Sequence, residues 1–366
     1  MKVLQVIYGL HVGGAESFLY NLLEGLDENI FRVDIVIQDA NITNKKLELL
    51  CKKRKIGIYI ITKFNKNVIK HARDLKRILD LGYDVVHIHV NALVNIIPVI
   101  MANKVTSKVI IHSHSTKNNS GGIVARWLHL INRSYINRLN IIALACGKEA
   151  GMWMFKENKF FVVPNAVNIS EYKYNEEKRK KIRKEKGLYN EYVIGHVGRF
   201  VEAKNHSFLL KVFAKYKEKN EGKLLLVGDG LLKENVVRLA EELKIIDSVV
   251  FCGECQNVNE YYSAFDCVIM PSIYEGLPFS LIEAQMAGLR IIASTSVSEE
   301  ANFTGNIVYI DLEENIEKWV EQIVYILENN SRNTLDYVVE NSKYNVVNMI
   351  KMIESIYQEG GGNIEK

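Results

Sequence analysis

The stretch SIYEGLPFSLIEAQMAG, residues 272–288, contains two carboxylates that are eight residues apart. The first, Glu275, leads into a Gly-Leu-Pro turn, and the second, Glu283, lies among apolar neighbours on a helical pattern. An acid in a loop and an acid on a half-buried helix have different surroundings, so we expect them to make different contacts. What they contact depends on the elements that position them and on the other polar loops of the chain.

Two cations and two glycines follow other strand-like runs. Arg199 and Lys204 flank the start of a helix in GHVGRFVEAKNHSFLL, residues 195–210, where a pair of cations can neutralise a diphosphate. Gly13 and Gly14 lie between the first strand and the first helix, where backbone N–H groups can approach an anion. The alternative is a tight turn that needs glycine for its own geometry. The pattern is not G-x-G-x-x-G, so a dinucleotide site is weakly supported.

Histidines form two close pairs, at 87–89 and 112–114, and strand alternation places each pair on one face of a strand. A metal site needs converging ligands, usually with carboxylates nearby, and neither stretch contains one. We therefore predict no metal site, with a metallohydrolase as a secondary reading. The chain has no D-x-D, G-x-S-x-G or Walker A motif. Cys252 and Cys255 form a C-x-x-C, which we interpret as structural because zinc would need a second pair.

Short apolar runs alternate with amphipathic ones along the chain, which predicts parallel sheets covered by helices on both faces. The expected strands are residues 2–8, 32–38, 56–62, 84–90, 108–114, 140–146 and 159–165, then 192–198, 223–229, 248–253, 266–272, 289–295 and 306–312. The charged segment 171–192 interrupts this rhythm, and we expect a linker and a leading helix there.

We predict an α/β protein with two tandem Rossmann-like, doubly wound domains facing a central cleft. The expected first domain is 1–170, on the acceptor side, and the second is 171–342, which binds the nucleotide sugar. Residues 343–366 are expected to form a C-terminal helix that packs back on the first domain and ends in a frayed tail. In such sheets, ligands bind at the carboxyl ends of the strands.

Composition narrows the class of protein further. The 366 residues are 48% hydrophobic and 25% charged, as in a globular protein, and no apolar run reaches membrane-spanning length. We find no signal-peptide pattern, and five cysteines, an odd number, suit the reducing cytoplasm. Residues 1–170 hold 23 Lys and Arg against 12 Asp and Glu, a net charge of +11, whereas the rest carries −7. The basic half predicts an anionic partner, or else a solvated lysine surface.

Six motifs occur in order and in register: GGAE (13–16), HSHS (112–115), VPNAV (163–167), GRFVEAKN (198–205), LLVGDG (225–230) and PSIYEGLPFSLIEAQMAG (271–288). Together they resemble family 4 of the retaining glycosyltransferases, which have the GT-B fold. The likeness covers nearly the whole chain and is strongest with bacterial capsule and exopolysaccharide transferases. The E-x7-E element, with Arg199 and Lys204 upstream, is specific to that group of enzymes.

The resemblance implies a role for each acid. Glu283 would accept hydrogen bonds from the ribose hydroxyls of a donor nucleotide, and Glu275 would hold the transferred sugar. The structural alternatives are a helix-capping acid for Glu275 and a lysine-paired acid for Glu283. Between them, the backbone amides of Phe279 and Ser280 would bind the diphosphate. Pro278 replaces a glycine that many relatives carry; proline has no N–H, and we expect it at the first helical position.

The resemblance also implies a catalytic set and a donor-binding set. His114 would match the family's active-site histidine, with His112 as the competing choice on the same strand face. The implied catalytic residues are His114, Arg199, Lys204 and Glu275. The implied residues that bind the nucleotide sugar are Gly13, Gly14, Gly198, Gly228, Phe279, Ser280 and Glu283.

The predicted enzyme is a retaining hexosyltransferase that needs no cofactor and acts in surface polysaccharide synthesis. It would move a hexosyl or N-acetylhexosaminyl group from a nucleoside-diphosphate sugar, a UDP-sugar by family resemblance, to a hydroxyl of a glycan or lipid-linked saccharide. The alternatives are a non-hydrolysing nucleotide-sugar epimerase and a non-catalytic nucleotide-sugar-binding protein. No aromatic-basic stripe suggests nucleic-acid binding.

Segment 121–140 raises the question of a membrane partner. Its apolar residues are interspersed with Arg126, Arg133 and Arg138. One interpretation is a helix whose apolar side packs on the first sheet. The other is that its basic edge, with the lysines around 45–55 and 63–76, meets an anionic bilayer, so that a cytoplasmic enzyme attaches peripherally to the inner face of the membrane.

Overall fold

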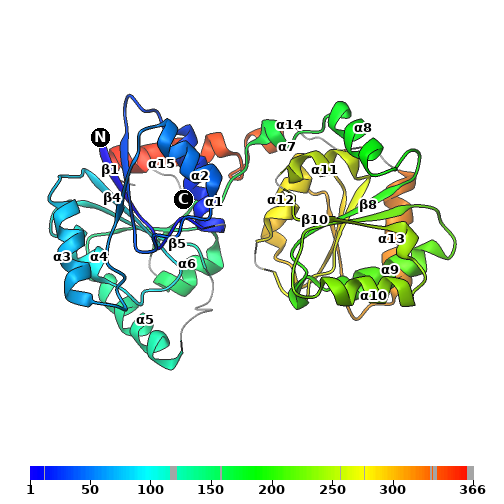
Figure 1. The fold of residues 1–366 in the computed structure, drawn as a ribbon, viewed down its shortest axis with the longest axis horizontal. Coiled ribbons are helices and arrows are strands. Elements are labelled where there is room, and N and C mark those ends of the chain that lie inside the picture. Colours follow the sequence, from blue (N-terminus) through cyan, green and yellow to red (C-terminus); the bar gives the residue numbers. More distant parts are fainter. Residues whose placement is uncertain are drawn as a thin grey trace. The chain divides into compact units, whose positions relative to one another are not determined.

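The computed structural model describes residues 1–11, 13–115, 122–156, 159–255, 257–275, 277–329, 332 and 336–360. The chain divides into two compact units (Figure 1). Unit 1 comprises Met1–Ala166 and Lys343–Lys366, and unit 2 comprises Val167–Ser342. Among the described residues, no helix is both long and apolar enough to cross a bilayer.

Unit 1 contains a parallel sheet of seven strands in the order β3-β2-β1-β4-β5-β6-β7. Its strands are β1 (Lys2–Val6), β2 (Arg32–Ile37), β3 (Gly57–Ile60), β4 (Val85–Val90), β5 (Lys108–Ser113), β6 (Ile142–Ala145) and β7 (Phe161–Val162). Its helices are α1 (Gly14–Gly25), α2 (Lys45–Lys53), α3 (Val68–Leu79), α4 (Ile97–Ala102), α5 (Ile123–Ile136), α6 (Lys148–Phe155) and α15 (Val346–Glu359).

The core of unit 1 follows from strand alternation. Val3 and Leu4 are both fully buried but belong to separate hydrophobic clusters on opposite faces of the sheet. Helices α1, α2 and α15 cover one face, and α3, α4 and α6 cover the other (Figure 1). The last helix of the chain therefore completes the core of the first unit, where Ile353, Ile356 and Tyr357 are buried.

Unit 2 contains a parallel sheet of six strands in the order β10-β9-β8-β11-β12-β13. Its strands are β8 (Val193–Val197), β9 (Lys223–Val227), β10 (Val249–Gly253), β11 (Cys267–Met270), β12 (Ile291–Ser294) and β13 (Ile307–Ile310). Its helices are α7 (Ile169–Tyr172), α8 (Glu176–Glu185), α9 (His206–Lys217), α10 (Lys233–Glu242), α11 (Val258–Ala264), α12 (Phe279–Met286), α13 (Ile316–Glu328) and α14 (Asp336–Glu340). Three 3₁₀ turns complete it: η1 (Glu202–Lys204), η2 (Ile246–Ser248) and η3 (Glu299–Ala301).

The predicted α/β class with two Rossmann-like doubly wound sheets is confirmed, and each expected strand is present with its ends trimmed by a few residues. The charged segment 171–192 contains the end of α7 and all of α8. Helix α8 is fixed to unit 2 because Arg179 and Arg183 each form an ion pair with Asp266, at 2.6 Å. The buried Asp266 also accepts the backbone N–H of Val193 at the start of β8.

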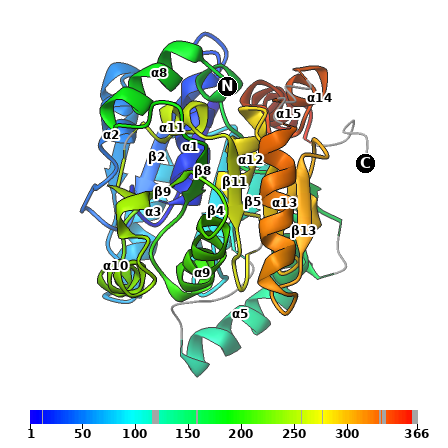
Figure 2. The same cartoon turned by 90° about the vertical axis from the view of Figure 1, so that its right-hand side faces the viewer.

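Helix α5 lies at the margin of unit 1 (Figures 1 and 2). The exposed fractions of its side chains show that it presents an apolar side to solvent. Side chains spaced along this face are largely exposed: Ile123 at 78%, Val124 at 72%, Trp127 at 63% and Ile131 at 61%. His129 and Ile136 are buried on the opposite side. Of the two interpretations of this segment, packing of its apolar side on the sheet is wrong for these outward-facing positions.

Candidate active site

The polar loops singled out in the sequence lie at the two switch points of the sheets. In unit 1, β1 is flanked by β2 and β4, and in unit 2, β8 is flanked by β9 and β11. Helices that leave neighbouring strands on opposite faces open a crevice at the carboxyl end of such strands. The loops after β1, β5, β8, β9 and β11 carry the predicted residues, so the topology explains why the predicted residues of each unit gather near one sheet edge.

In unit 2, Lys204 and Glu275 form an ion pair in which Nζ lies 2.7 Å from a carboxylate oxygen. Their side chains are only 15% and 20% exposed. Lys204 ends the 3₁₀ turn η1, and Glu275 follows β11. The N–H of Ile273 donates to the carbonyl of Ala203, which joins the two loops next to the pair. The sequence assigned the two residues to different parts of a ligand, and the structure brings them into direct contact.

The glycines of these loops permit a close approach. Gly228 has a φ of +140°, and a Cβ there would lie 2.1 Å from the carbonyl oxygen of Gly198. A Cβ on Gly198 would come within 3.1 Å of the Lys204 side chain, which therefore lies across it. Gly198 and Gly228 thus allow the β8 and β9 loops to pack together and aim Lys204. Arg199, which directly follows Gly198, is exposed to solvent.

Helix α12 begins at Phe279, directly after Pro278. Pro278 is the N-cap, with φ −75° and ψ 120°, so its expected place at the first helical position is wrong by one residue. The reason is that its ψ is extended, and the first helical dihedral pair belongs to Phe279. The amides of Phe279 and Ser280 are in the first turn, where N–H groups have no partner four residues earlier within the helix. Gly276 lies outside the described residues.

Glu283 is held by two tyrosines. The hydroxyl of Tyr172 donates to one carboxylate oxygen at 2.9 Å, and that of Tyr262 donates to the other at 2.7 Å. Burial raises the pKa of Glu283, and these two hydrogen bonds act in the opposite direction. Its apolar neighbours Leu281, Ile282 and Ala284 are buried and fix the helix. The alternative of a lysine partner for Glu283 is therefore wrong, because its partners are the two tyrosines. The acid that has a lysine partner is Glu275, which contacts Lys204.

In unit 1, Gly13 is the N-cap of α1, and Gly14 is its first residue. Gly13 is extended, with φ −171°, and no side chain caps the helix. A Cβ on Gly13 would lie 2.6 Å from the Glu16 carboxylate, and one on Gly14 would lie 3.3 Å from Asn165. Gly14 is exposed and Gly13 is partly exposed, so the backbone at the start of α1 is open to a ligand, and a side chain at either position would lie against Glu16 or Asn165.

The histidines of β4 and β5 form one cluster on the face of the sheet that α1 covers. His89 and His112 are register partners, and the Phe18 ring lies 4.6 Å from that of His112. Nδ1 of His89 lies 2.9 Å from Nε2 of His114, and Nε2 of His89 lies 2.9 Å from Oε1 of Gln5. The side chain that the sequence favoured, His114, is therefore oriented by a chain of hydrogen bonds.

Burial determines the charge of this cluster. It lowers the pKa of His114 to about 3 and that of His87 to about 3, and it lowers those of His89 and His112 well below the usual range. The imidazoles are therefore neutral at physiological pH. Nε2 of His114 is engaged by His89 and its buried Nδ1 has no partner among the described residues, so Nδ1 is the ring nitrogen left for a ligand, and the ring does not offer a positive charge.

Three members of the cluster have the spacing of a metal site, because ligand atoms of His87, His89 and His112 lie within 4.8 Å of one another. However, both ring nitrogens of His89 already have hydrogen-bond partners, and Nδ1 of His87 lies 2.8 Å from the Tyr357 hydroxyl. Each of the three ligands would also be neutral, leaving two buried positive charges without compensation from them. Three ring nitrogens of His87 and His89 are thus already engaged, which disfavours an ion, whereas Nε2 of His87 and both ring nitrogens of His112 make no hydrogen bond among the described residues.

Cys252, in the C-x-x-C motif, is not a reactive group. Burial raises the pKa of the Cys252 thiol to about 11, so at neutral pH it is the thiol and not the reactive thiolate.

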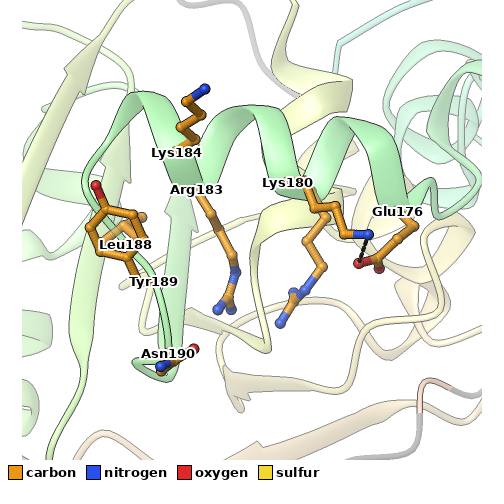
Figure 3. Close-up of a pocket in the computed structure, with 8 residues that line it drawn as sticks. Glu176, Lys180, Arg183, Lys184, Leu188, Tyr189 and Asn190 are labelled. Carbon is orange, nitrogen blue, oxygen red and sulfur yellow. Dashed lines mark ion pairs between the residues drawn. The ribbon is translucent and has the colours of Figure 1, made fainter.

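A surface pocket between α8 and the loop after it is basic (Figure 3). Its Arg179 and Arg183 share Asp266, and its Lys180 pairs with Glu176 at 3.6 Å, so each of these three cations already has a carboxylate partner.

Two family models match the chain, and together they cover most of it. Residues 12–171 match the model described as Glycosyltransferase Family 4, and residues 178–344 match Glycosyl transferases group 1. The chain is a family 4 glycosyltransferase. It is therefore an enzyme of the retaining class that uses nucleotide-sugar donors, as predicted.

Individual proteins agree with this family. The chain is 29% identical over 336 residues to the putative glycosyltransferase EpsF of Bacillus subtilis, covering 88% of this chain and 86% of the relative. It is 24% identical over 311 residues to an Escherichia coli UDP-Gal:alpha-D-GlcNAc-diphosphoundecaprenol alpha-1,3-galactosyltransferase, covering 78% of each. The crystal structure of Anabaena Alr3699/HepE in complex with UDP has a TM-score of 0.80 at 17% identity, covering 97% of this chain and 99% of that one. This likeness confirms the GT-B fold.

The sequence missed the residues that support the transferase's polar side chains. Tyr172 and Tyr262 hold Glu283, and Gln5 and His89 hold His114. Tyr172 lies 111 residues from its acid, so no local spacing connects them. Gln5 had one signal: it is a polar residue inside an apolar strand, and it is fully buried.

Proposed function

We propose that this transferase moves a hexosyl or N-acetylhexosaminyl group from a UDP-sugar to a hydroxyl of a saccharide or lipid-linked saccharide in surface polysaccharide synthesis. The observation that carries the donor site is the Lys204–Glu275 ion pair at the carboxyl end of the second sheet, in the loop that leads to α12. In the donor, the sugar is bonded directly to the diphosphate. A cation that binds the diphosphate and an acid that binds the sugar hydroxyls must therefore lie next to each other, as Lys204 and Glu275 do.

The proposed chemistry is charge stabilisation of the leaving group. Cleavage of the sugar–phosphate bond builds negative charge on the diphosphate, which Arg199, Lys204 and the amides of Phe279 and Ser280 would stabilise. Lys204 has three N–H donors, so it can keep its bond to Glu275 and still donate to phosphate. The acceptor would attack from the face that the leaving group vacates, and a phosphate oxygen would take its proton. Neutral His114 would hold a hydroxyl of the transferred sugar.

The choice of UDP and of a lipid-linked acceptor is supported by relatives. The Anabaena protein was crystallised with UDP and with UDP-glucose. The Escherichia coli relative is named for a UDP-Gal donor and a diphosphoundecaprenol-linked acceptor. A Campylobacter jejuni relative, 24% identical over 316 residues, is also named for a diphospho-undecaprenol-linked acceptor. We extend these substrate classes to this chain as part of the proposal, without naming the sugar.

A donor panel tests the proposed reaction. Purified protein is incubated with UDP-sugars and other nucleotide sugars, in the presence of a chelator, with and without lipid-diphosphate-linked saccharides. Nucleotide release should need a UDP-sugar and an acceptor, and it should persist with chelator because Arg199 and Lys204 supply the counter-charge. An altered nucleotide sugar formed without acceptor would indicate the epimerase instead. Activity lost on chelation and restored by a divalent ion would move the histidine cluster into the mechanism.

The proposed enzyme works at the inner face of the cell membrane, with α5 as its contact. The outward side chains Ile123, Trp127 and Ile131 are four residues apart, so they form one stripe on the helix. Segment 122–141 carries three arginines and no acid. An exposed apolar stripe bounded by cations fits the interface of an anionic bilayer, where each near-surface cation adds about 1 kcal/mol.

The arginines of this segment have different roles. Arg126 and Arg138 are exposed, whereas Arg133 is half-buried and donates to the carbonyl of Trp153 at 3.0 Å. The lysines of 45–55 and 63–76 contribute less than their number suggests, because Lys52 and Lys63 are paired with Glu48 and Asp39. Arg126 and Arg138 are therefore the cations that we expect to meet the lipid.

Vesicle co-sedimentation tests this contact. Binding should require anionic lipid and fall steeply between low and physiological salt, and Trp127→Ser with Ile131→Ser should abolish it at low salt. Arg126→Gln with Arg138→Gln should weaken it about tenfold or more, given about 1 kcal/mol for each cation. Leu231→Ser, which removes a 96% exposed leucine in unit 2, is the control and should have no effect. No lipid dependence at low salt, or a dimer that needs Trp127, would overturn the membrane contact.

A further inference from the structure

We propose that Tyr172 and Tyr262 are positioning residues for the donor nucleotide, which act by holding the Glu283 carboxylate in one orientation. The inference rests on the proposed function, because it takes Glu283 as the acceptor of the ribose hydroxyls. It adds two residues on other helices that control how well this acid performs that task.

The geometry leaves room for a ribose. An ionised carboxylate has two oxygens and about four lone-pair positions. The tyrosine hydroxyls use one on each oxygen, at 2.9 Å and 2.7 Å. Each oxygen therefore keeps an acceptor position for one of the two neighbouring hydroxyls of a ribose. The two tyrosines also prevent rotation of the carboxylate, since a turn of its plane would break both bonds.

The tyrosines come from helices that are themselves fixed. Tyr262 is in α11 and has no exposed surface. Tyr172 ends α7, the first helix of unit 2, whose carbonyl at Glu171 accepts from Lys178 and from Asn259. Helices α7, α11 and α12 thus converge on one carboxylate, and the segment that opens unit 2 becomes part of the nucleotide site.

The other charged groups on these helices do not bond to the Glu283 carboxylate, whose partners are the two tyrosines. Glu283 is the only ionisable residue of α12. On α11, Glu260 is paired with Lys181 at 2.7 Å, and on α7 the nearest acid is Glu171. Arg332 is the cation next to these helices, and it donates to the backbone carbonyls of Tyr262, at 3.2 Å, and Ala287, at 2.8 Å. Among the described residues, Glu283 forms no ion pair, so the hydrogen bonds from Tyr172 and Tyr262 are the contacts that oppose the effect of burial on its pKa. Removing them should let Glu283 take up a proton at higher pH, and a protonated carboxyl cannot accept both ribose hydroxyls.

The test measures UDP affinity by calorimetry for Tyr172→Phe, Tyr262→Phe and the double variant. Each single change should raise Kd about tenfold at neutral pH, as loss of a hydrogen bond to a charged group often does. Relative to the wild type, the affinity of the double variant should fall further as the pH is lowered from about 8 to about 6. Phenylalanine keeps the ring packing, and thermal unfolding without UDP checks that the fold is intact.

Tyr174→Phe is the matched control, because its hydroxyl bonds to the exposed Glu176 and lies outside the Glu283 group. It should leave UDP affinity and its pH profile unchanged. Glu283→Ala separates the two hypotheses. If Glu283→Ala loses affinity while both tyrosine variants keep wild-type Kd and pH profile, the positioning role is overturned and the donor site stands. If Glu283→Ala also binds UDP normally, the inference falls together with the proposed donor site.

Discussion

Replacing Lys204 with alanine is expected to lower kcat by about two to three powers of ten, and replacing Arg199 by about two. The negative charge on the diphosphate grows as the sugar bond breaks, so a cation placed beside it stabilises the transition state more than the bound donor. Lys204 is the better positioned of the two, since it is mostly buried and held at 2.7 Å from Glu275. Steady-state kinetics with a fixed acceptor would measure the loss.

The control for this experiment is Lys211→Ala, which removes an exposed lysine from α9. It should leave kcat unchanged, and the unfolding temperature of all three variants should stay close to that of the wild type. The ion pair adds a stricter requirement: in a double-mutant cycle, Lys204→Ala and Glu275→Ala should be clearly non-additive, because each removes the partner of the other. Full activity in both Arg199→Ala and Lys204→Ala would exclude this site.

The strands could be read from the sequence because buried parallel strands are continuous apolar runs with few competing interpretations. Runs such as KLLLVGD and DCVIMPS are too short for buried helices and rich in branched residues, and they became β9 and β11. Helix α5 shows what the hydrophobic pattern cannot predict. Periodicity identifies an apolar stripe but not what covers it, and the outward side of α5 carries Trp127 and Ile131.

For a related reason, the sequence predicted the charged residues of the candidate site but not the residues that hold them. Arg199, Lys204, Glu275 and Glu283 stand in short motifs whose spacing carries chemical information. Their partners do not: Tyr172 and Tyr262 reach Glu283 across 111 and 21 residues, and only the packing of α7 and α11 against α12 joins them. The Lys204–Glu275 pair is also a product of the fold, since it depends on the β8 and β11 loops ending side by side.

The two acids should respond differently when each is replaced by alanine. Glu283→Ala is expected to weaken binding of UDP itself by about tenfold or more, because a hydrogen bond to a charged group is worth about 1.5–3 kcal/mol. Its loss also leaves the Tyr172 and Tyr262 hydroxyls without their acceptor. Calorimetric titration with UDP, which carries the ribose and diphosphate but no sugar, isolates this contact.

Glu275→Ala should leave the affinity for UDP intact or slightly higher, because Lys204 loses its carboxylate partner and is freed for the diphosphate. The same variant should bind the intact UDP-sugar less tightly relative to UDP and turn it over far more slowly, since the sugar hydroxyls lose their acceptor. The ratio of the two Kd values, donor over UDP, is therefore the diagnostic quantity: it should rise for Glu275→Ala and stay constant for Glu283→Ala. Equal losses of UDP affinity in both variants would show that the division of roles between the two carboxylates is wrong.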